Sequence, residues 1–239
     1  MNALFGLLAK IIAYPMTWLY RLTGSYAASI ILITFIIRAI LIPLQSKSTN
    51  QQAKMAELQS QVDEIKVRYA RDQATMNEKI NELYSKEGIG SMSGCLPLLI
   101  QFPIILGLYQ LLREPLTYMA GTPGMLAAVH ESFLWVPDLS QPDAWILPIL
   151  AAATTYLSTS LATKGQDSAS AGALKGMTFF SPIMIFLLGR SFAAGLTLYW
   201  FAGNLFMMVQ TMILNKKREK AKLKAAAQAE IVKRKKSEK

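Results

Sequence analysis

The residue with the clearest chemical potential in this sequence is Arg38, which lies within the apolar stretch TFIIRAILIP at positions 34–43. An arginine near the middle of a bilayer costs from about 2.5 to above 10 kcal/mol, depending on the measure. No Asp, Glu or His lies inside any of the five apolar segments that approach membrane-spanning length, so no partner within a span can neutralise the charge. Such a cation requires water, or a negative charge from another molecule.

Motifs that would indicate an enzyme fail in context. The stretch GSMSG at 90–94 matches the G-x-S-x-G nucleophile pattern, which needs a strand–turn–helix setting and a histidine partner. Here it lies between a polar helical segment and an apolar one, while the single histidine, His130, falls in another connecting segment. The single cysteine, Cys95, excludes an intrachain disulfide and a thiolate cluster. We expect no catalytic residue, no metal and no cofactor.

The apolar segments predict the fold class. Hydrophobic residues make up 52% of the 239-residue chain and its mean hydropathy is +0.29, which is typical of a membrane protein. Segments of about 20 apolar residues cross a bilayer as helices, and we place five of them at 25–45, 95–113, 144–162, 177–192 and 194–214. The last two predict a tight helical hairpin that turns near Arg190. The expected fold is an all-α polytopic membrane protein with five transmembrane helices.

Two further segments have helical patterns of a different kind. Residues 1–24 predict an amphipathic helix at the outer interface, with apolar residues at helical spacing: Leu4, Leu8, Ile11, Trp18 and Leu22. Because no positive charge precedes its apolar run, retention is favoured over cleavage as a signal peptide. Residues 46–90 are polar and charge-mixed, with two narrow apolar stripes interrupted at 71–73. This pattern predicts a helical hairpin outside the membrane.

The distribution of Lys and Arg predicts the orientation. Of the 25 basic residues, 20 lie in segments 46–94, 163–176 and 215–239. The opposite side holds only Lys10, Arg21 and Arg190, together with Arg113 at the end of the second span. Since cytoplasmic segments carry the excess of basic residues, we expect the N-terminus outside and the C-terminus in the cytoplasm.

Polar residues inside the predicted spans gather in the halves nearer the cytoplasm. Thr34 and Arg38 are four residues apart and share a helix face; Gln101, Thr155 and Asn204 lie at central or inner depth. This placement predicts a wet cavity open to the cytoplasm and closed to the outside. The simpler interpretation is that hydroxyl and amide groups join helices to one another. It suffices for most of these residues but not for Arg38.

The chain resembles the YidC-type membrane protein insertases over about residues 10 to 214. The resemblance rests on GCLPLLIQFPIILGLYQLL at 94–112, FLWVPDLSQPDAWILPIL at 133–150, PIMIFLL at 182–188 and GLTLYWFAGNLFMMVQ at 195–210. It implies a five-helix core with a groove in which the arginine, matched by Arg38, attracts acidic groups of a substrate. Thr34 and Trp200 match groove-lining positions, and 46–90 matches a cytoplasmic loop needed for activity. The chain looks like a short form without a large periplasmic domain.

The expected function is therefore that of a membrane protein insertase and chaperone in the bacterial cell membrane, not an enzyme. The alternatives are a small-solute channel or transporter with Arg38 as an anion site, and an assembly factor that packs helices without inserting them. Expected partners are newly made membrane proteins and a Sec-type translocon. The tail 215–239, with 11 basic and 3 acidic residues, fits either ribosomal RNA or anionic lipid, and both interpretations stay open.

Overall fold

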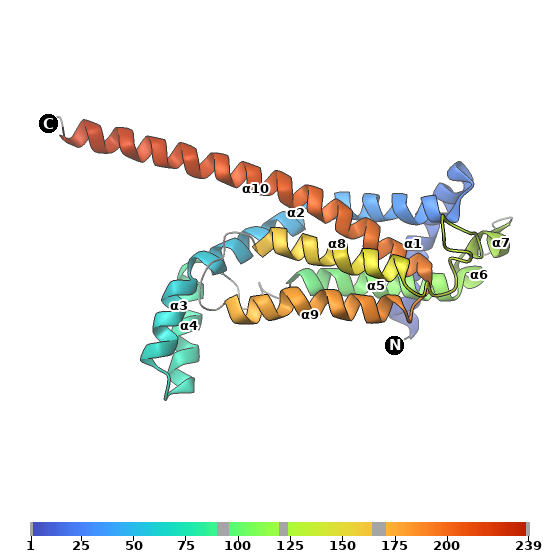
Figure 1. The fold of residues 1–239 in the computed structure, drawn as a ribbon, viewed down its shortest axis with the longest axis horizontal. Coiled ribbons are helices and arrows are strands. Elements are labelled where there is room, and N and C mark those ends of the chain that lie inside the picture. The colour runs from blue at the N-terminus through green and yellow to red at the C-terminus, as the bar shows by residue number, and fades with distance from the viewer. Residues whose placement is uncertain (1, 90–95, 120–123, 164–170, 238–239) are drawn as a thin grey trace.

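The computed structural model describes residues 2–89, 96–119, 124–163 and 171–237, and all regular structure in them is helical (Figure 1). The one strand-like feature there is an isolated bridge between Phe133 and Val136. The prediction of an all-α fold is confirmed. The GSMSG stretch and Cys95 lie outside the described residues, as do residues 164–170 of the predicted loop 163–176, whose last six residues belong to a helix that begins at Ala171.

Long helices run side by side along the long axis of the molecule (Figure 1). They are α2 (Tyr26–Glu57), α5 (Leu96–Arg113), α8 (Ile146–Thr163), α9 (Ala171–Gly189) and the first half of α10 (Ala194–Ser237). Two segments in the described residues are long and apolar enough to cross a membrane, Tyr26–Gln51 and Ala194–Lys217, and two shorter apolar ones are Ile146–Ala162 and Thr178–Gly189. α10 packs on both α2 and α8.

The last two apolar segments pack differently from the predicted tight hairpin. The turn lies where the sequence placed it, between Gly189 and Ala194, but α9 packs mainly on α8 rather than on α10. Ring pairs join α8 and its N-terminal flank to α9: Tyr156 with Phe179 at 5.8 Å and Trp145 with Phe186 at 6.1 Å between centroids. A Cβ at Gly189 would stand 3.3 Å from the Cβ of Pro148, so the two helices approach closely where glycine allows it.

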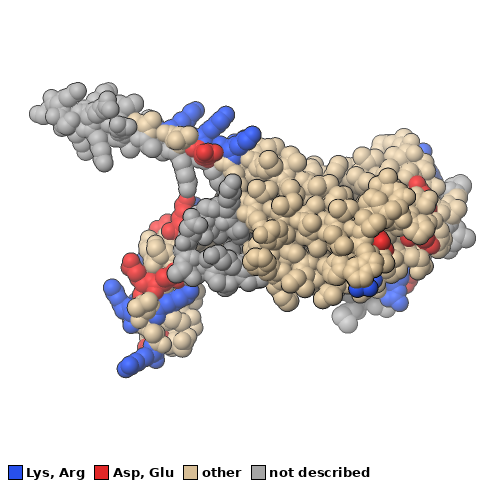
Figure 2. All heavy atoms as spheres, in the orientation of Figure 1, with Lys and Arg blue, Asp and Glu red and all other residues tan. Residues whose placement is uncertain are grey.

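The two ends of the bundle differ. At one end, here called the hairpin end, α3 (Gln59–Arg68) and α4 (Gln73–Lys86) form an antiparallel pair, and Asp72 caps α4 by accepting from the Thr75 amide at 3.1 Å. At the other, called the loop end, lie α6 (Pro115–Tyr118), α7 (Met125–Val129) and the loop 130–145. Charged residues gather at both ends of the face in Figure 2, with uncharged residues across its middle. This is the distribution expected of a bundle with an apolar belt.

Helix α1 (Asn2–Thr23) crosses the bundle at the loop end and packs on α5 and α2 (Figure 1). Its contact with α5 is close, since a Cβ at Gly107 would stand 3.0 Å from the Cβ of Leu8. One face of α1 buries Ala13 and Met16, while the face carrying Ile11 and Trp18 is exposed. The helix is therefore apolar on two faces, one of which is occupied by the bundle.

The hydrophobic core lies at the loop end and gives way to buried polar residues toward the hairpin end. On α2 the buried residues before Thr34 are apolar except Ser29, and from Thr34 on those described are Thr34, Arg38 and Ser48. On α8 the change falls between Ala151 and Thr154. On α10 it follows Ala202, with Thr197 the exception. Three neighbouring helices thus change the character of their buried faces at about the same level.

Candidate functional site

Arg38 is the one charged side chain that is buried among residues whose burial the structure describes, with 6% of it exposed. Its Nη1 donates to the sulfur of Met207 at 3.2 Å, and its Nε has no hydrogen-bond partner. The ion pairs found among the described residues do not involve it. The guanidinium is thus buried with little to balance its charge or its donors.

This environment is energetically unfavourable for arginine. The group has five N–H donors and keeps its charge in proteins, while a thioether is a weak acceptor. A buried donor left unsatisfied costs about 1–3 kcal/mol, and more where the group is charged. The site would therefore be stabilised by any acceptor that reaches it, above all an anionic one.

Thr34 is fully buried one turn before Arg38 on the same face of α2. Its hydroxyl donates to the carbonyl of Ile30 at 2.6 Å. The donor is therefore used within the helix, and what remains available is the acceptor capacity of the oxygen.

Gln101 is connected to α10 by a hydrogen bond to Tyr199, a residue that the sequence analysis did not identify as part of the site. Its Nε2 donates to the hydroxyl of Tyr199 at 2.7 Å, which joins α5 to α10. Tyr199 lies one turn before Gly203, and a Cβ at Gly203 would stand 2.7 Å from Nη2 of Arg38. Trp200, the next residue of α10, is half-buried, and the contacts described for the chain do not join it to Arg38.

Asn204 and Thr155 form a separate polar contact between α10 and α8. The Asn204 amide donates to the Thr155 hydroxyl at 2.7 Å, and that hydroxyl donates to the Ala151 carbonyl at 2.7 Å. The neighbouring Gly203 faces α2, where a Cβ would stand 2.7 Å from Nη2 of Arg38. The predicted site residues therefore form two groups on different sides of α10.

Sequence reasoning missed the residues of α10 that touch Arg38 or lie near it. Tyr199, Gly203 and Met207 are spaced by four, which places them on one face. That spacing was a usable signal, but an aromatic residue, a glycine and a methionine do not read as a site for a cation.

Buried polar atoms without a partner continue from Arg38 toward the hairpin end. They are the side-chain oxygens of Gln45 and Ser48 on α2 and Gln210 on α10. Gln45 lies seven residues, or about 10 Å, beyond Arg38, and Gln210 lies seven beyond Gly203. We call Arg38, Gln45, Ser48 and Gln210 the polar seam. Atoms of this kind are normally satisfied by water or by a ligand.

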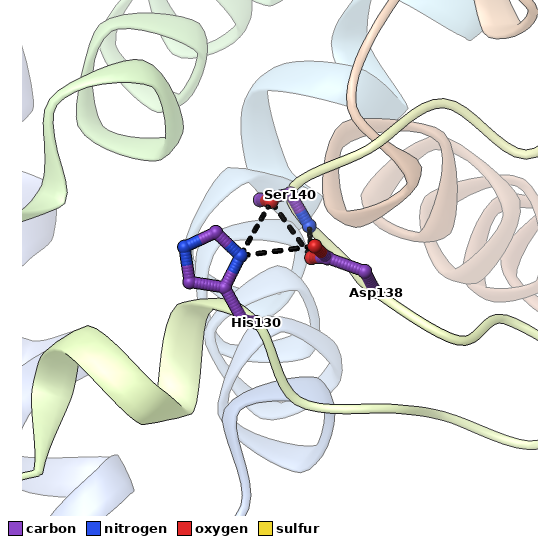
Figure 3. A network of polar contacts seen from close by, with 3 residues as sticks. All are labelled: His130, Asp138 and Ser140. Atoms are coloured by element: carbon purple, nitrogen blue, oxygen red, sulfur yellow. Dashed lines mark hydrogen bonds and ion pairs between the residues drawn. The ribbon is translucent and has the colours of Figure 1, made fainter.

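The loop end carries a Ser–His–Asp cluster whose geometry differs from that of a catalytic triad (Figure 3). Both Ser140 Oγ, at 3.0 Å, and Asp138 Oδ2, at 2.9 Å, meet the same nitrogen of His130, Nδ1. A triad uses opposite ring nitrogens for these two partners. Burial raises the pKa of Asp138, but hydrogen bonds from His130 and Ser140 outweigh it, so the pKa lies below its usual value. A pocket of about 740 Å³ beside the cluster is lined by Arg113, Phe192 and others, away from Arg38.

The loop 130–145 is tied to the helices beneath it. Glu131 accepts from the Ser25 hydroxyl at 2.8 Å and from the Tyr26 amide, at the start of α2. The first amides of α10 donate to the loop as well, Ala194 to the Gln141 carbonyl at 2.8 Å and Gly195 to the Leu139 carbonyl at 2.9 Å. These bonds hold the loop 130–145 against the N-terminal ends of α2 and α10.

Comparisons with known proteins identify relatives along most of the chain. A family model described as 60Kd inner membrane protein matches residues 18–222. "Membrane protein insertase YidC 1" of Listeria monocytogenes is 34% identical over 239 residues, covering 94% of this chain and 79% of the relative. "Membrane protein insertase YidC" of Clostridium perfringens is 39% identical over 214 residues, covering 85% and 86%.

A solved structure is similar as well. It is described as an active YidC insertase with its first transmembrane domain resolved, and it superposes with a TM-score of 0.61 at 29% identity. The match covers 88% of this chain but only 45% of that one, so the present chain spans less than half of the solved protein. The family is one of insertases and chaperones rather than of enzymes. The chain is therefore a member of the 60Kd inner membrane protein family, to which the YidC-type insertases belong.

Proposed function

We propose that this chain is a membrane protein insertase that inserts newly made membrane proteins and helps them fold, with Arg38 as the group that attracts the substrate. The observation that carries this proposal is the buried guanidinium, which has one sulfur acceptor and no counter-charge among the described residues. The names of the relatives support the same function.

Arg38 attracts an acidic group in the polar segment of the substrate, and the polar seam receives that segment. Water or substrate groups satisfy the seam oxygens, so the polar segment crosses less hydrocarbon than it would in plain lipid. The transmembrane part of the substrate then leaves into lipid along apolar surfaces of α8 and α10, where Trp200 and exposed side chains such as Leu157 and Val209 lie. No chemical energy source is needed, because the hydrophobic helix is more stable in the bilayer than in water.

In this proposal α2, α5, α8, α9 and the first half of α10 span the membrane of a bacterial cell. The hairpin end is cytoplasmic, the loop end is outside, and α1 lies at the outer interface. Apolar core residues around the starts of α2 and α10, among them Ile30 and Leu198, support a closed outer side. So do the bonds from Glu131 and from the loop 130–145.

The basic tail contacts a partner in the cytoplasm. α10 continues as one helix to Ser237 and leaves the bundle rather than folding back over it (Figure 1). The segment from Lys216 to Ser237 would reach about 33 Å at 1.5 Å per residue. This reach favours ribosomal RNA over the lipid surface as its main anionic partner, with anionic lipid and a Sec-type translocon as further contacts.

The apolar core at the loop end also favours an insertase over a small-solute channel. A channel needs polar groups along the whole path, and the buried residues of the loop-end half are largely apolar.

The test compares two substrates that differ only in their translocated tail, one acidic and one neutral. Arg38→Ala should lower insertion of the acidic substrate at least about tenfold, since losing a charge-assisted hydrogen bond costs about 1.5–3 kcal/mol. Arg38→Lys should restore most of it. Arg190→Ala, which changes an exposed arginine at the loop end, is the control. Normal insertion of the acidic substrate by Arg38→Ala would overturn the proposal.

A further inference from the structure

The Nε–Nη2 edge of the Arg38 guanidinium lies against a place where α10 has no side chain. A Cβ at Gly203 would stand 2.7 Å from Nη2, 3.1 Å from Nε and 3.3 Å from Cζ of Arg38. Distances below 3.0 Å are essentially never seen for real Cβ atoms, so any other residue at 203 would claim the space that the guanidinium occupies. Gly203 lies inside a continuous helix, where the backbone conformation does not require glycine. The position needs glycine because a larger side chain would overlap the Arg38 guanidinium.

One hydrogen-bond acceptor contacts the guanidinium beside Gly203. Met207, one turn further along α10, accepts from Nη1 through its sulfur at 3.2 Å. Nε faces Gly203 and has no partner. The guanidinium is therefore held by shape and by a weak acceptor, and its charge is left unneutralised.

We propose that Gly203 is a positioning residue which, with Met207, forms a seat for the Arg38 guanidinium and so fixes where it meets the carboxylate of a substrate. The inference rests on the proposed function of Arg38 and adds the residues that hold it. A charge kept in surroundings of low dielectric attracts an incoming carboxylate more strongly than one in water. Because thioether sulfur is a weak acceptor, a carboxylate can replace it without breaking a strong bond.

Gly203→Ala disturbs the seat without damaging the helix. Alanine favours the helical state over glycine, and the atoms it would meet are the far end of a flexible side chain, which can move. The guanidinium is therefore expected to leave the seat toward water. Gly195→Ala is the matched control: this glycine is buried in the same helix, and its Cβ would meet Ile30, Leu139 and Leu112 instead.

The first measurement reads the seat directly and does not depend on insertion. Full-length protein in liposomes is treated with phenylglyoxal, and modification of Arg38 is followed by mass spectrometry relative to exposed Arg190. Arg38 is 94% buried in the wild type. If its guanidinium leaves the seat in Gly203→Ala, the rate at which phenylglyoxal modifies Arg38 should rise several-fold, whereas in Gly195→Ala this rate should not change. Met207→Leu, which keeps the volume but removes the sulfur, should raise it to a smaller extent. Equal rates in wild type, Gly203→Ala and Met207→Leu would overturn the seat.

The second measurement uses the acidic and neutral substrates. Gly203→Ala should lower insertion of the acidic substrate roughly fivefold, about the effect of one misplaced hydrogen bond, and affect the neutral substrate less. In an Arg38→Ala background it should have no further effect on the acidic substrate. Equal losses for both substrates, or a further loss in that background, would contradict a role through Arg38.

The two proposals fail in different ways. If Arg38→Ala inserts the acidic substrate normally, the proposed function fails. The phenylglyoxal modification rates still show whether Gly203 and Met207 hold the Arg38 guanidinium. If Arg38→Ala is defective but Gly203→Ala matches Gly195→Ala in both measurements, the seat alone is wrong.

Discussion

Glu131 should stabilise the fold from the loop end, although it lies more than 100 residues from the helix it caps. Ser25 precedes α2, and its hydroxyl accepts from the Ala28 amide at 3.3 Å, as an N-cap residue does. Glu131 adds a second cap, because it accepts from the Ser25 hydroxyl at 2.8 Å and from the Tyr26 amide. Its charge also lies at the positive end of the α2 helix dipole.

The magnitude follows from these contacts. Loss of a cap costs about 0.5–2 kcal/mol, and a favourable charge at a helix N-terminus contributes about 0.3–1 kcal/mol. Glu131→Ala should therefore destabilise the protein by about 1–3 kcal/mol. For a chain of this length each kcal/mol lowers Tm by roughly 2–4 °C, so the shift should be roughly 2–12 °C. Glu131→Gln keeps an acceptor but loses the charge, and should cost only the electrostatic part.

The assay is thermal unfolding of the full chain in detergent micelles, with Glu114→Ala as the control. Glu114 is an exposed residue of the same end whose side chain makes no capping hydrogen bond to α6. In a double-mutant cycle, Ser25→Ala and Glu131→Ala should be less than additive, because each removes the same bond. If Glu131→Ala unfolds like Glu114→Ala, or if the cycle is strictly additive, the long-range cap is refuted.

Two further predictions concern the other polar contacts. The lowered pKa of Asp138 means that its carboxylate contributes stability above its unfolded pKa, and that this contribution is lost as pH falls through the folded value. Asp138→Asn should therefore lower Tm at about pH 7 but not at strongly acidic pH, below the usual carboxyl range near 4; an equal effect at both would contradict this. Asn204→Ala should cost about 0.6–1.7 kcal/mol, as interhelical hydrogen bonds in membranes do. Thermal unfolding should show that Thr155→Val adds little to it, and full additivity would show that the two side chains are not coupled.

The helical period was enough to predict much of α2. A spacing of four placed Thr34 and Arg38 on one face, and both are buried on that face. The interruption at 71–73 falls between α3 and α4, whereas α2 continues as one helix to Glu57, past the predicted end of the first span at 45. The five spans, which rest on apolar length, and the orientation, which rests on the distribution of basic residues, remain proposals.

Contacts between helices could not be derived in the same way. The seat for Arg38 depends on the rotation and the axial shift of α10 against α2, which bring Gly203 to a residue 165 positions earlier. The packing of α9 on α8 has a similar cause, because ring pairs such as Tyr156 with Phe179 decide it rather than the short turn to α10. The helical pattern of a sequence predicts which face of its helix a residue occupies. Which residue of another helix it contacts depends on how the helices pack.

Helices α2 and α10 are held by more hydrogen bonds at the loop end than toward the hairpin end. Toward the hairpin end, the side-chain contacts described between the two helices are the Arg38–Met207 hydrogen bond and the ring pair Phe35–Phe206, at 5.9 Å between centroids. The seam oxygens there have no protein partners to lose. At the loop end, separation would break the bonds that tie α2 to Glu131 and α10 to the loop carbonyls. Each of these bonds adds to the cost of separating the helices at that end. Under the proposed function, we expect the two helices to separate from the hairpin end, which would expose Arg38 without breaking the bonds at the other end.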